Sequence, residues 1–250
     1  MKNILIIHQS SELYGSDKTL LILLKRINTN KFFCVVVLPN NGPLQIELEK
    51  IGIKVIISPV LKLYRDIFGF RNGIQFLKDI FKSVSLLKKL HKEYKFDIVY
   101  SNTLAVLLGA IFARKKNLKH IWHVHEIIEH PKFIAWLFPK LLYYFSNSII
   151  CNSESTKSNI VSKENKNLKK IKVVHNGIDF QNTIAQIEKK DFGFTDGDVI
   201  ITLVGRINRL KGHNWLLQTF TEYFKETKNV KLLFVGSPVP NQEFYLQDIA

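Results

Sequence analysis

Short apolar runs alternate with amphipathic stretches along the first 180 residues of the chain. The runs are rich in β-branched residues and are bounded by polar or glycine-containing turns, which is typical of buried strands. The stretches between them have the 3.6-residue spacing of helices that bury one face. We predict seven strands, at 3–8, 32–38, 54–59, 96–102, 120–126, 148–153 and 171–178. Helices are predicted over about 17–26, 44–51, 73–93 and 104–113, and from residue 154.

This alternation predicts an α/β fold with a parallel, doubly wound sheet. The seven strands complete one Rossmann-like domain over residues 1–180, and the polar segment 181–197 is expected to be a linker. A new unit begins at residue 198, with predicted strands at 199–204 and 230–235 around a helix at 214–225. Because two strands do not make a stable parallel sheet, we expect residues 198–250 to be the first part of a second Rossmann-like domain.

The turn after the strand at 199–204 carries unusual positive charge in the sequence "VGRINRLKGHNW". A helix that follows a parallel strand presents unpaired N–H groups and partial positive charge, which suit anions. Gly205 would let a ligand approach the backbone closely, and the cationic groups of Arg206 and Lys211 would suit a diphosphate. The same spacing also fits a solvated turn with ordinary surface charges. Arg209 and His213 are expected at the surface.

Five motifs together resemble a known family. They are "YGSDKTLLILL" (14–24), "WHVHEI" (122–127), "IICNSESTKSNI" (149–160), "VVHNGID" (173–179) and "VGRINRLKGHNWLLQTF" (204–220). In this order the sequence resembles the retaining GT-B glycosyltransferases of the GT4 family, which includes bacterial polysaccharide and lipopolysaccharide sugar transferases. The resemblance implies a GT-B fold, with an acceptor-side domain at 1–180 and part of a nucleotide-sugar-binding domain at 198–250.

The resemblance also implies a donor site. Arg206 and Lys211 match the catalytic pair that, beside Gly205, holds the donor diphosphate and stabilises the leaving nucleoside diphosphate. No metal or other cofactor would then be required. Asn176 and Gly177 match the junction between the two domains. The donor would be a UDP- or GDP-sugar, and the acceptor a glycan or a lipid-linked glycan precursor.

In the first domain, the resemblance implies that His125 lies near the transferred sugar. Gly15, Ser16 and Asp17 match the loop that approaches the donor phosphates and the acceptor. The family commonly has Gly-Gly-x-Glu there, whereas this chain has Tyr14 in place of one glycine, which leaves the loop conformation open. The E-x7-E segment that binds the donor sugar and ribose in the family would lie beyond residue 250.

Two histidines of "HVHE" share one face of the predicted strand at 120–126. His123 and His125 would make an incomplete zinc site, and no third ligand is evident in the sequence. We therefore predict no metal there, with His125 facing a cleft and His123 structural.

Other functions are also consistent with parts of the sequence. GT-B folds serve nucleotide-sugar epimerases as well, although the "NGID" and "GR…KGH" pair favours sugar transfer. The chain could also be an inactive fragment or a non-catalytic nucleotide-sugar-binding GT-B protein. No nucleic-acid partner is expected, because the sequence has no RNP, zinc-finger or KH signature.

The net charge of +15 arises from the first 190 residues, which alone carry +16. Basic residues are dense at 62–95, and an aromatic segment, "FIAWLFPKLLYYF", covers 133–145. One interpretation is a domain helix with a solvated lysine face, whose apolar stripe is formed by Leu77, Ile80, Phe81, Val84 and Leu87. The alternative is that both segments contact an anionic membrane surface.

The sequence shows no secretory signal and no apolar run approaching the roughly 20 residues of a membrane span. Cys34 and Cys151 lie beside strand-like apolar residues and are predicted to be buried, reduced thiols. We therefore expect a cytoplasmic protein, with peripheral association at the inner face of the plasma membrane as an open alternative.

Overall fold

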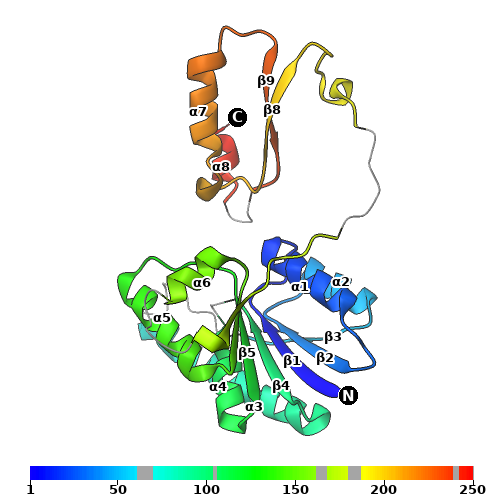
Figure 1. Cartoon of the computed structure of the whole chain (residues 1–250), viewed down its shortest axis with the longest axis vertical. Helices are drawn as coiled ribbons and strands as arrows, with labels where there is room; N and C mark the ends of the chain where they lie inside the picture. Colours follow the sequence, from blue (N-terminus) through cyan, green and yellow to red (C-terminus); the bar gives the residue numbers. More distant parts are fainter. Residues whose placement is uncertain (61–69, 104–105, 162–167, 180–186, 239–241, 250) are drawn as a thin grey trace. The chain divides into compact units, whose positions relative to one another are not determined.

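The computed structural model describes residues 1–60, 70–103, 106–161, 168–179, 187–238 and 242–249. The chain divides into two compact units, Met1–Phe180 and Gln181–Ala250 (Figure 1). The first unit has the fold class that the sequence predicts, with a parallel sheet between helices. None of the described helices is long and apolar enough to cross a membrane.

The first unit contains a seven-stranded parallel sheet in the order β3-β2-β1-β4-β5-β6-β7. Its strands are β1 (Lys2–His8), β2 (Phe32–Leu38), β3 (Lys54–Ile57), β4 (Ile98–Asn102), β5 (Lys119–Val124), β6 (Ser148–Cys151) and β7 (Ile171–Val173). All seven were predicted, with ends that differ by a few residues. The chain builds outward from β1 to β3, and then crosses back to place β4 on the other side of β1. Ligands of doubly wound sheets bind at the carboxyl ends of the strands beside such a switch point.

Among the described residues, six α-helices surround the sheet of the first unit. They are α1 (Gly15–Arg26), α2 (Pro43–Lys50), α3 (Phe70–Tyr94), α4 (Leu107–Lys116), α5 (Lys132–Phe145) and α6 (Glu154–Val161). Helices α1 and α2 pack on one face, and α3 and α4 pack on the other (Figure 1). Alternate residues of β1 serve the two faces: Ile6 packs toward α1, whereas Leu5 and Ile7 pack toward α3 and α4. This double burial explains why the strands are apolar along their length.

The helix bounds differ from the prediction most clearly at α1, α3 and α4, and α3 begins at Phe70 rather than at residue 73. Helix α1 begins at Gly15, two residues earlier than expected, and Tyr14 is its N-cap. Helix α4 begins at Leu107, and the first two residues of its predicted range, 104 and 105, lie outside the described residues. It continues to Lys116 and ends because Asn117 takes a left-handed conformation (φ 52°, ψ 41°).

The predicted apolar stripe of α3 is wrong at Phe81. Val84 and Leu87 are buried against the sheet as expected, but the side chain of Phe81 is 74% exposed. The side chains of Leu77 and Ile80 lie outside the described residues. Phe81 directly precedes Lys82 in the helix and lies with the exposed lysines rather than with the core.

Both cysteines are buried and unbonded, as predicted. Burial raises the pKa of Cys34 and of Cys151 to about 11, so neither thiol ionises near neutral pH. Both side chains pack in the apolar core.

The second unit is a smaller βαβ structure. Strands β8 (Val199–Val204) and β9 (Val230–Val235) pair in parallel and have the predicted bounds. Helix α7 (His213–Phe224) connects them, and the short helix α8 (Phe244–Gln247) follows. No residue of β8 or β9 is fully buried, because the described part of this unit is too small to cover both faces of the pair.

Part of the predicted linker has a defined local fold within the second unit. Residues Lys189–Phe192 form a 3-10 turn. The Lys189 ammonium donates hydrogen bonds to the carbonyls of Asp196 and Asp198, at 2.9 and 2.7 Å. These bonds hold the turn against the start of β8.

Candidate functional site

Polar side chains meet at the carboxyl ends of β1, β4 and β5 in the first unit. The strand register pairs His8 with Asn102, and Asn102 with His123. Register partners of neighbouring parallel strands project to the same face, so these three side chains lie on the face that α1 covers. His125 follows β5 by one residue and is half-buried.

Hydrogen bonds connect His125, Asn102 and His8 in a line that continues to Asp17 in α1. The Nε2 atom of His125 lies 2.9 Å from Asn102 Oδ1. The Asn102 amide nitrogen lies 3.0 Å from His8 Nδ1, and His8 Nε2 lies 2.6 Å from Asp17 Oδ1. His8, Asn102 and Asp17 are almost completely buried, so water does not compete for these bonds.

The carboxylate of Asp17 is fully buried and accepts from three donors. Besides the bond from His8, its second oxygen accepts from the Tyr14 backbone N–H at 2.9 Å and from the Ser10 hydroxyl at 3.2 Å. Asp17 is the third residue of α1, where the helix N-terminus also favours negative charge. These donors offset the cost of burying the carboxylate.

The structure separates the three residues that were predicted as a ligand loop. Gly15 and Ser16 are at the solvent-facing start of α1, and a Cβ added to Gly15 would meet nothing within 4 Å. Asp17 points inward to His8 instead, so it does not face the solvent with the other two. Helix α1 begins two residues before Asp17, whose carboxylate accepts from the N–H of the N-cap residue Tyr14.

Burial favours the neutral form of His123 and His125. It lowers the pKa of His125 to about 4, assisted by the nearby His8 and opposed by Asp17. It lowers the pKa of His123 to about 3, with a smaller contribution from His125, whose ring centroid is 4.0 Å away. His123 is buried and lies 2.6 Å from the Tyr100 hydroxyl through Nδ1, which agrees with the predicted structural role.

The second group of predicted residues lies on the loop between β8 and α7. Ile207 is buried, and its N–H bonds to the Ser237 carbonyl at 3.0 Å. The Asn208 side-chain oxygen accepts from the N–H groups of Leu210 and Lys211, at 3.0 and 3.1 Å. These bonds shape the 3-10 turn Arg209–Lys211 that precedes α7.

Lys211 folds back over Gly205. A Cβ added to Gly205 would lie 3.5 Å from Lys211 Cδ, so the aliphatic stem of the lysine runs beside the glycine. Arg206 and Lys211 are both exposed on this loop. The structure therefore brings the predicted donor residues of this unit together at the end of β8.

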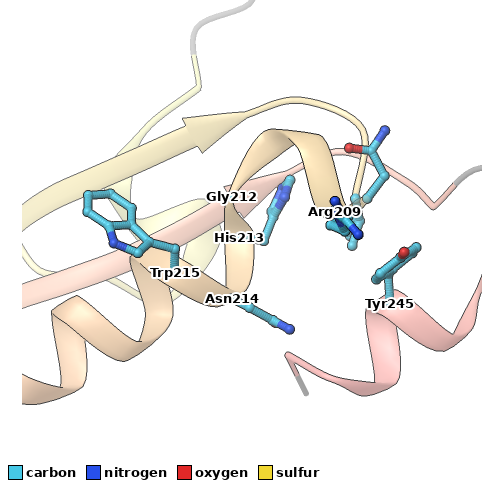
Figure 2. Close-up of a pocket in the computed structure, with 8 residues that line it drawn as sticks. Arg209, Gly212, His213, Asn214, Trp215 and Tyr245 are labelled. Carbon is cyan, nitrogen blue, oxygen red and sulfur yellow. The ribbon is translucent and has the colours of Figure 1, made fainter. Parts of the chain in front are cut away.

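A cavity of about 230 Å³ lies at the start of α7 (Figure 2). It is lined by Ile207, Asn208, Arg209, Gly212, His213, Asn214, Trp215 and Tyr245. Arg209 is exposed, as predicted, but the prediction of a surface position for His213 is wrong, since it is only 3% exposed. The first turn of α7 directs this ring toward β9, where it makes an edge contact with Phe234 at 5.1 Å.

Asn176 and Gly177 lie on the exposed segment between β7 and the end of the first unit. This segment is tied to α1 by an ion pair between Asp179 and Arg26, at 2.7 Å. His125, Gly15 and Ser16 thus belong to the first unit, whereas Gly205, Arg206 and Lys211 belong to the second. Within the described ranges, no three His, Cys, Asp or Glu side chains are grouped as metal ligands would be.

Comparison with known proteins identifies the family. The model of Glycosyltransferase Family 4 matches residues 15–182, which is more than half of the chain. The chain belongs to glycosyltransferase family 4. A curated family relative, the capsular polysaccharide biosynthesis glycosyltransferase CapM of Staphylococcus aureus, is 30% identical over 195 residues. That match covers 72% of this chain and 49% of CapM, so the chain spans about half the length of this relative.

Solved structures show the same GT-B type fold. Anabaena Alr3699/HepE in complex with UDP and glucose has a TM-score of 0.76 at 19% identity. The match covers 100% of this chain and 65% of that one. UDP-GlcNAc 2-epimerase from Neisseria meningitidis, bound to UDP-GlcNAc, has a TM-score of 0.59 at 15% identity and covers 99% and 69%. The same fold is thus found in a protein named as a nucleotide-sugar epimerase.

Four residues of these sites were missed by the sequence interpretation. His8 and Asn102 end β1 and β4, and a polar residue at the end of an apolar strand is a signal that could have found them. Asn208 could have been recognised as a turn-forming residue before "RLK". Gly236 had no sequence signal beyond its place after a strand, because its role depends on a contact with Gly205.

We predict that the first unit loses stability as the pH falls from about 6.5 toward 4. His120 and His123 are buried, and their pKa values of about 4 and 3 lie below the 6.5 of an unfolded histidine. The unfolded chain therefore binds protons first, which lowers the free energy of unfolding by on the order of a few kcal/mol. Urea unfolding, followed by the fluorescence of the buried Trp122, measures this change between pH 7.5 and 5. Equal stability at both pH values would contradict it, and His120→Gln should reduce the dependence.

We predict that Gly236→Ala displaces the loop between β8 and α7. An added Cβ would lie 1.9 Å from the Gly205 carbonyl oxygen, so one of the two backbone segments must move. The expected cost is roughly 1–3 kcal/mol, seen as faster amide hydrogen exchange in β8 and β9. Gly197→Ala is the matched control in the same unit, because its Cβ meets nothing within 4 Å. Equal exchange in the two variants would show that the loop tolerates the added atom.

Proposed function

We propose that the protein is a glycosyltransferase that moves a sugar from a UDP- or GDP-sugar to an acceptor, with retention of anomeric configuration. Membership of glycosyltransferase family 4 supports sugar transfer. The likeness to Alr3699/HepE in complex with UDP and glucose supports a nucleotide-sugar donor. The likeness to CapM supports an acceptor in envelope polysaccharide synthesis, either a glycan or a lipid-linked precursor.

The loop between β8 and α7 is the observation that carries this proposal. Exposed Arg206 and Lys211 lie with Gly205 at the carboxyl end of a parallel strand, where anionic ligands bind. We assign the two cations to the donor diphosphate, where they stabilise the charge on the leaving group. No metal is needed in this scheme. The effect of EDTA on turnover tests whether a metal is needed. The anomeric coupling of the product tests the retention of configuration.

In the first unit, Gly15, Ser16 and His125 are assigned to the acceptor and the transferred sugar. The open space above Gly15 supports close approach of a ligand to the start of α1. Asn176 and Gly177 are assigned to the junction between the two domains. An epimerase is the second candidate, because the fold is also that of UDP-GlcNAc 2-epimerase. The two functions differ in product. A transferase joins the sugar to an acceptor and releases the nucleoside diphosphate, whereas an epimerase yields another nucleotide sugar and needs no acceptor.

We predict that Arg206→Ala and Lys211→Ala each weaken the binding of UDP or GDP by roughly ten- to a hundredfold, because each removes a charge-assisted contact with the diphosphate. Arg209→Ala is the matched control, since Arg209 is an exposed cation of the same loop that we leave out of the site. Isothermal titration of the natural full-length protein measures all three.

Two outcomes would contradict the assignment. If all three variants bind the nucleotide like the unchanged protein, the loop does not hold the diphosphate. If Arg209→Ala is as damaging as the other two, the effect is one of general charge rather than of Arg206 and Lys211. Circular dichroism of the variants shows that the fold is kept, which is expected because the three side chains are exposed.

We also propose that the first unit binds the surface of an anionic membrane, at the inner face of the plasma membrane in the cytoplasm. Helix α3 exposes Phe81 beside a row of lysines, namely Lys78, Lys82, Lys88, Lys89 and Lys92. Helix α5 exposes three aromatic rings, with Phe133 61%, Trp136 55% and Tyr144 63% exposed. Exposed rings next to lysines suit the interface of an anionic bilayer, where each basic residue contributes about 1 kcal/mol. Lipid-linked acceptors are presented at such a surface.

We predict that the protein cosediments with phosphatidylcholine vesicles that contain phosphatidylglycerol, and that added salt weakens this binding. The double change Phe133→Ala and Trp136→Ala should lower the affinity roughly tenfold, because two rings no longer enter the interface. Trp215→Ala is the control, as an exposed tryptophan of the second unit. Absence of binding at low salt would refute the proposal, and equal binding by the double variant and the control would exclude α5.

A further inference from the structure

The hydrogen bonds from Asp17 to His125 form one continuous line, which we call the relay. It consists of Asp17, His8, Asn102 and His125, joined by contacts of 2.6, 3.0 and 2.9 Å. The relay crosses from α1 through the ends of β1 and β4 to the residue after β5. Its three inner members are buried, and only His125 at its end is half-buried.

The chemistry of its members gives the relay one direction. An ionised carboxylate can only accept, so His8 must donate to Asp17 through Nε2. The Asn102 NH₂ group faces the other nitrogen of His8, so Nδ1 accepts and the proton of His8 lies on Nε2. This places the amide oxygen of Asn102 toward His125, so that Nε2 of His125 must carry a proton and donate.

The relay ends at the second ring nitrogen of His125, Nδ1. Among the described residues, no hydrogen bond involves His125 Nδ1. Nε2 of His123 is a fully buried ring nitrogen without a partner in the described part of the chain. Nδ1 of His125 does not belong to that group, so it keeps some exposure. Because the ring is half-buried, Nδ1 is open to a ligand.

We propose that Asp17, His8 and Asn102 are positioning residues that hold His125 as the tautomer with the proton on Nε2. Nδ1 is then a fixed acceptor for a hydrogen-bond donor of the bound ligand, such as a sugar hydroxyl. A phosphate oxygen would be repelled by its lone pair. This role in catalysis rests on the proposed transferase function, whereas the tautomer itself does not. Asp17 and His8 thus act on the reaction without touching the substrate.

Nitrogen NMR of the 250-residue chain, with ¹⁵N-labelled histidine at pH 7, tests the relay without any substrate. We expect His125 to show a protonated Nε2 and a bare Nδ1. In Asn102→Leu, which removes both amide contacts but keeps a similar volume, the two tautomers of His125 should be mixed. Ser101→Ala is the matched control, because Ser101 precedes Asn102 in β4 and bonds instead to His120 at 2.9 Å. A proton on Nδ1 in the unchanged protein would overturn the proposal.

Kinetics of the full-length protein give the second measurement. Asn102→Leu should lower kcat/KM by tenfold or more, while Ser101→Ala changes it little. Asp17→Asn, which keeps the shape of the side chain but removes its charge, should disturb the tautomer of His125 in the same NMR spectra. If Asn102→Leu unfolds the chain, both the NMR and the kinetic measurement are made on Asp17→Asn instead.

The two proposals fail in different ways. If the expected tautomer is found and depends on Asn102 but no sugar is transferred, the relay holds and the transferase proposal fails. If sugar is transferred but Asn102→Leu is as active as Ser101→Ala, the relay proposal fails and the transferase function holds.

Discussion

A buried carboxylate organises the polar end of the first unit. Asp17 is fully buried, and it is stabilised because strand β1, the following loop and the N-cap residue of α1 all supply donors to it. These bonds fix the start of α1 and therefore the positions of Gly15 and Ser16. They also orient His8, and through Asn102 they orient His125. One charge thus sets the geometry of three strand ends that come from distant parts of the chain.

The second unit depends on a close backbone contact instead of a charge. Gly236 approaches the Gly205 carbonyl so closely that no side chain fits between them. Backbone bonds from Gly205 to Val235 and from Ile207 to Ser237 continue the pairing beyond β8. The loop is thereby held while Arg206 and Lys211 stay exposed. An anion site of this kind needs a backbone that is held in place and exposed cationic side chains, and this loop has both.

The family likeness and the physical arrangement support each other at different levels. Membership of glycosyltransferase family 4 rests on residues 15–182, nearly all of which belong to the first unit. The arrangement of Gly205, Arg206 and Lys211 belongs to the second unit and stands on its own geometry. The geometry of the loop supports an anion site, whereas its proposed assignment to the donor diphosphate rests on the family resemblance. The exposed position of Phe81 adds a feature that neither the family nor the pattern of the helix predicted.

The sequence by itself determined the order of elements, the parallel sheet and the two strands of the second unit, because strand and helix periodicity are local properties of the chain. Sequence motifs also singled out Arg206, Lys211 and His125 as candidate site residues, and their roles stay predictions. Tertiary structure decided that Asp17 is internal, that His213 is buried, and that Phe81 faces solvent. Each of these depends on what a neighbouring element places beside the residue: His8 beside Asp17, and Phe234 beside His213. Side-chain type and spacing do not record such contacts, because the partners lie on other elements of the fold.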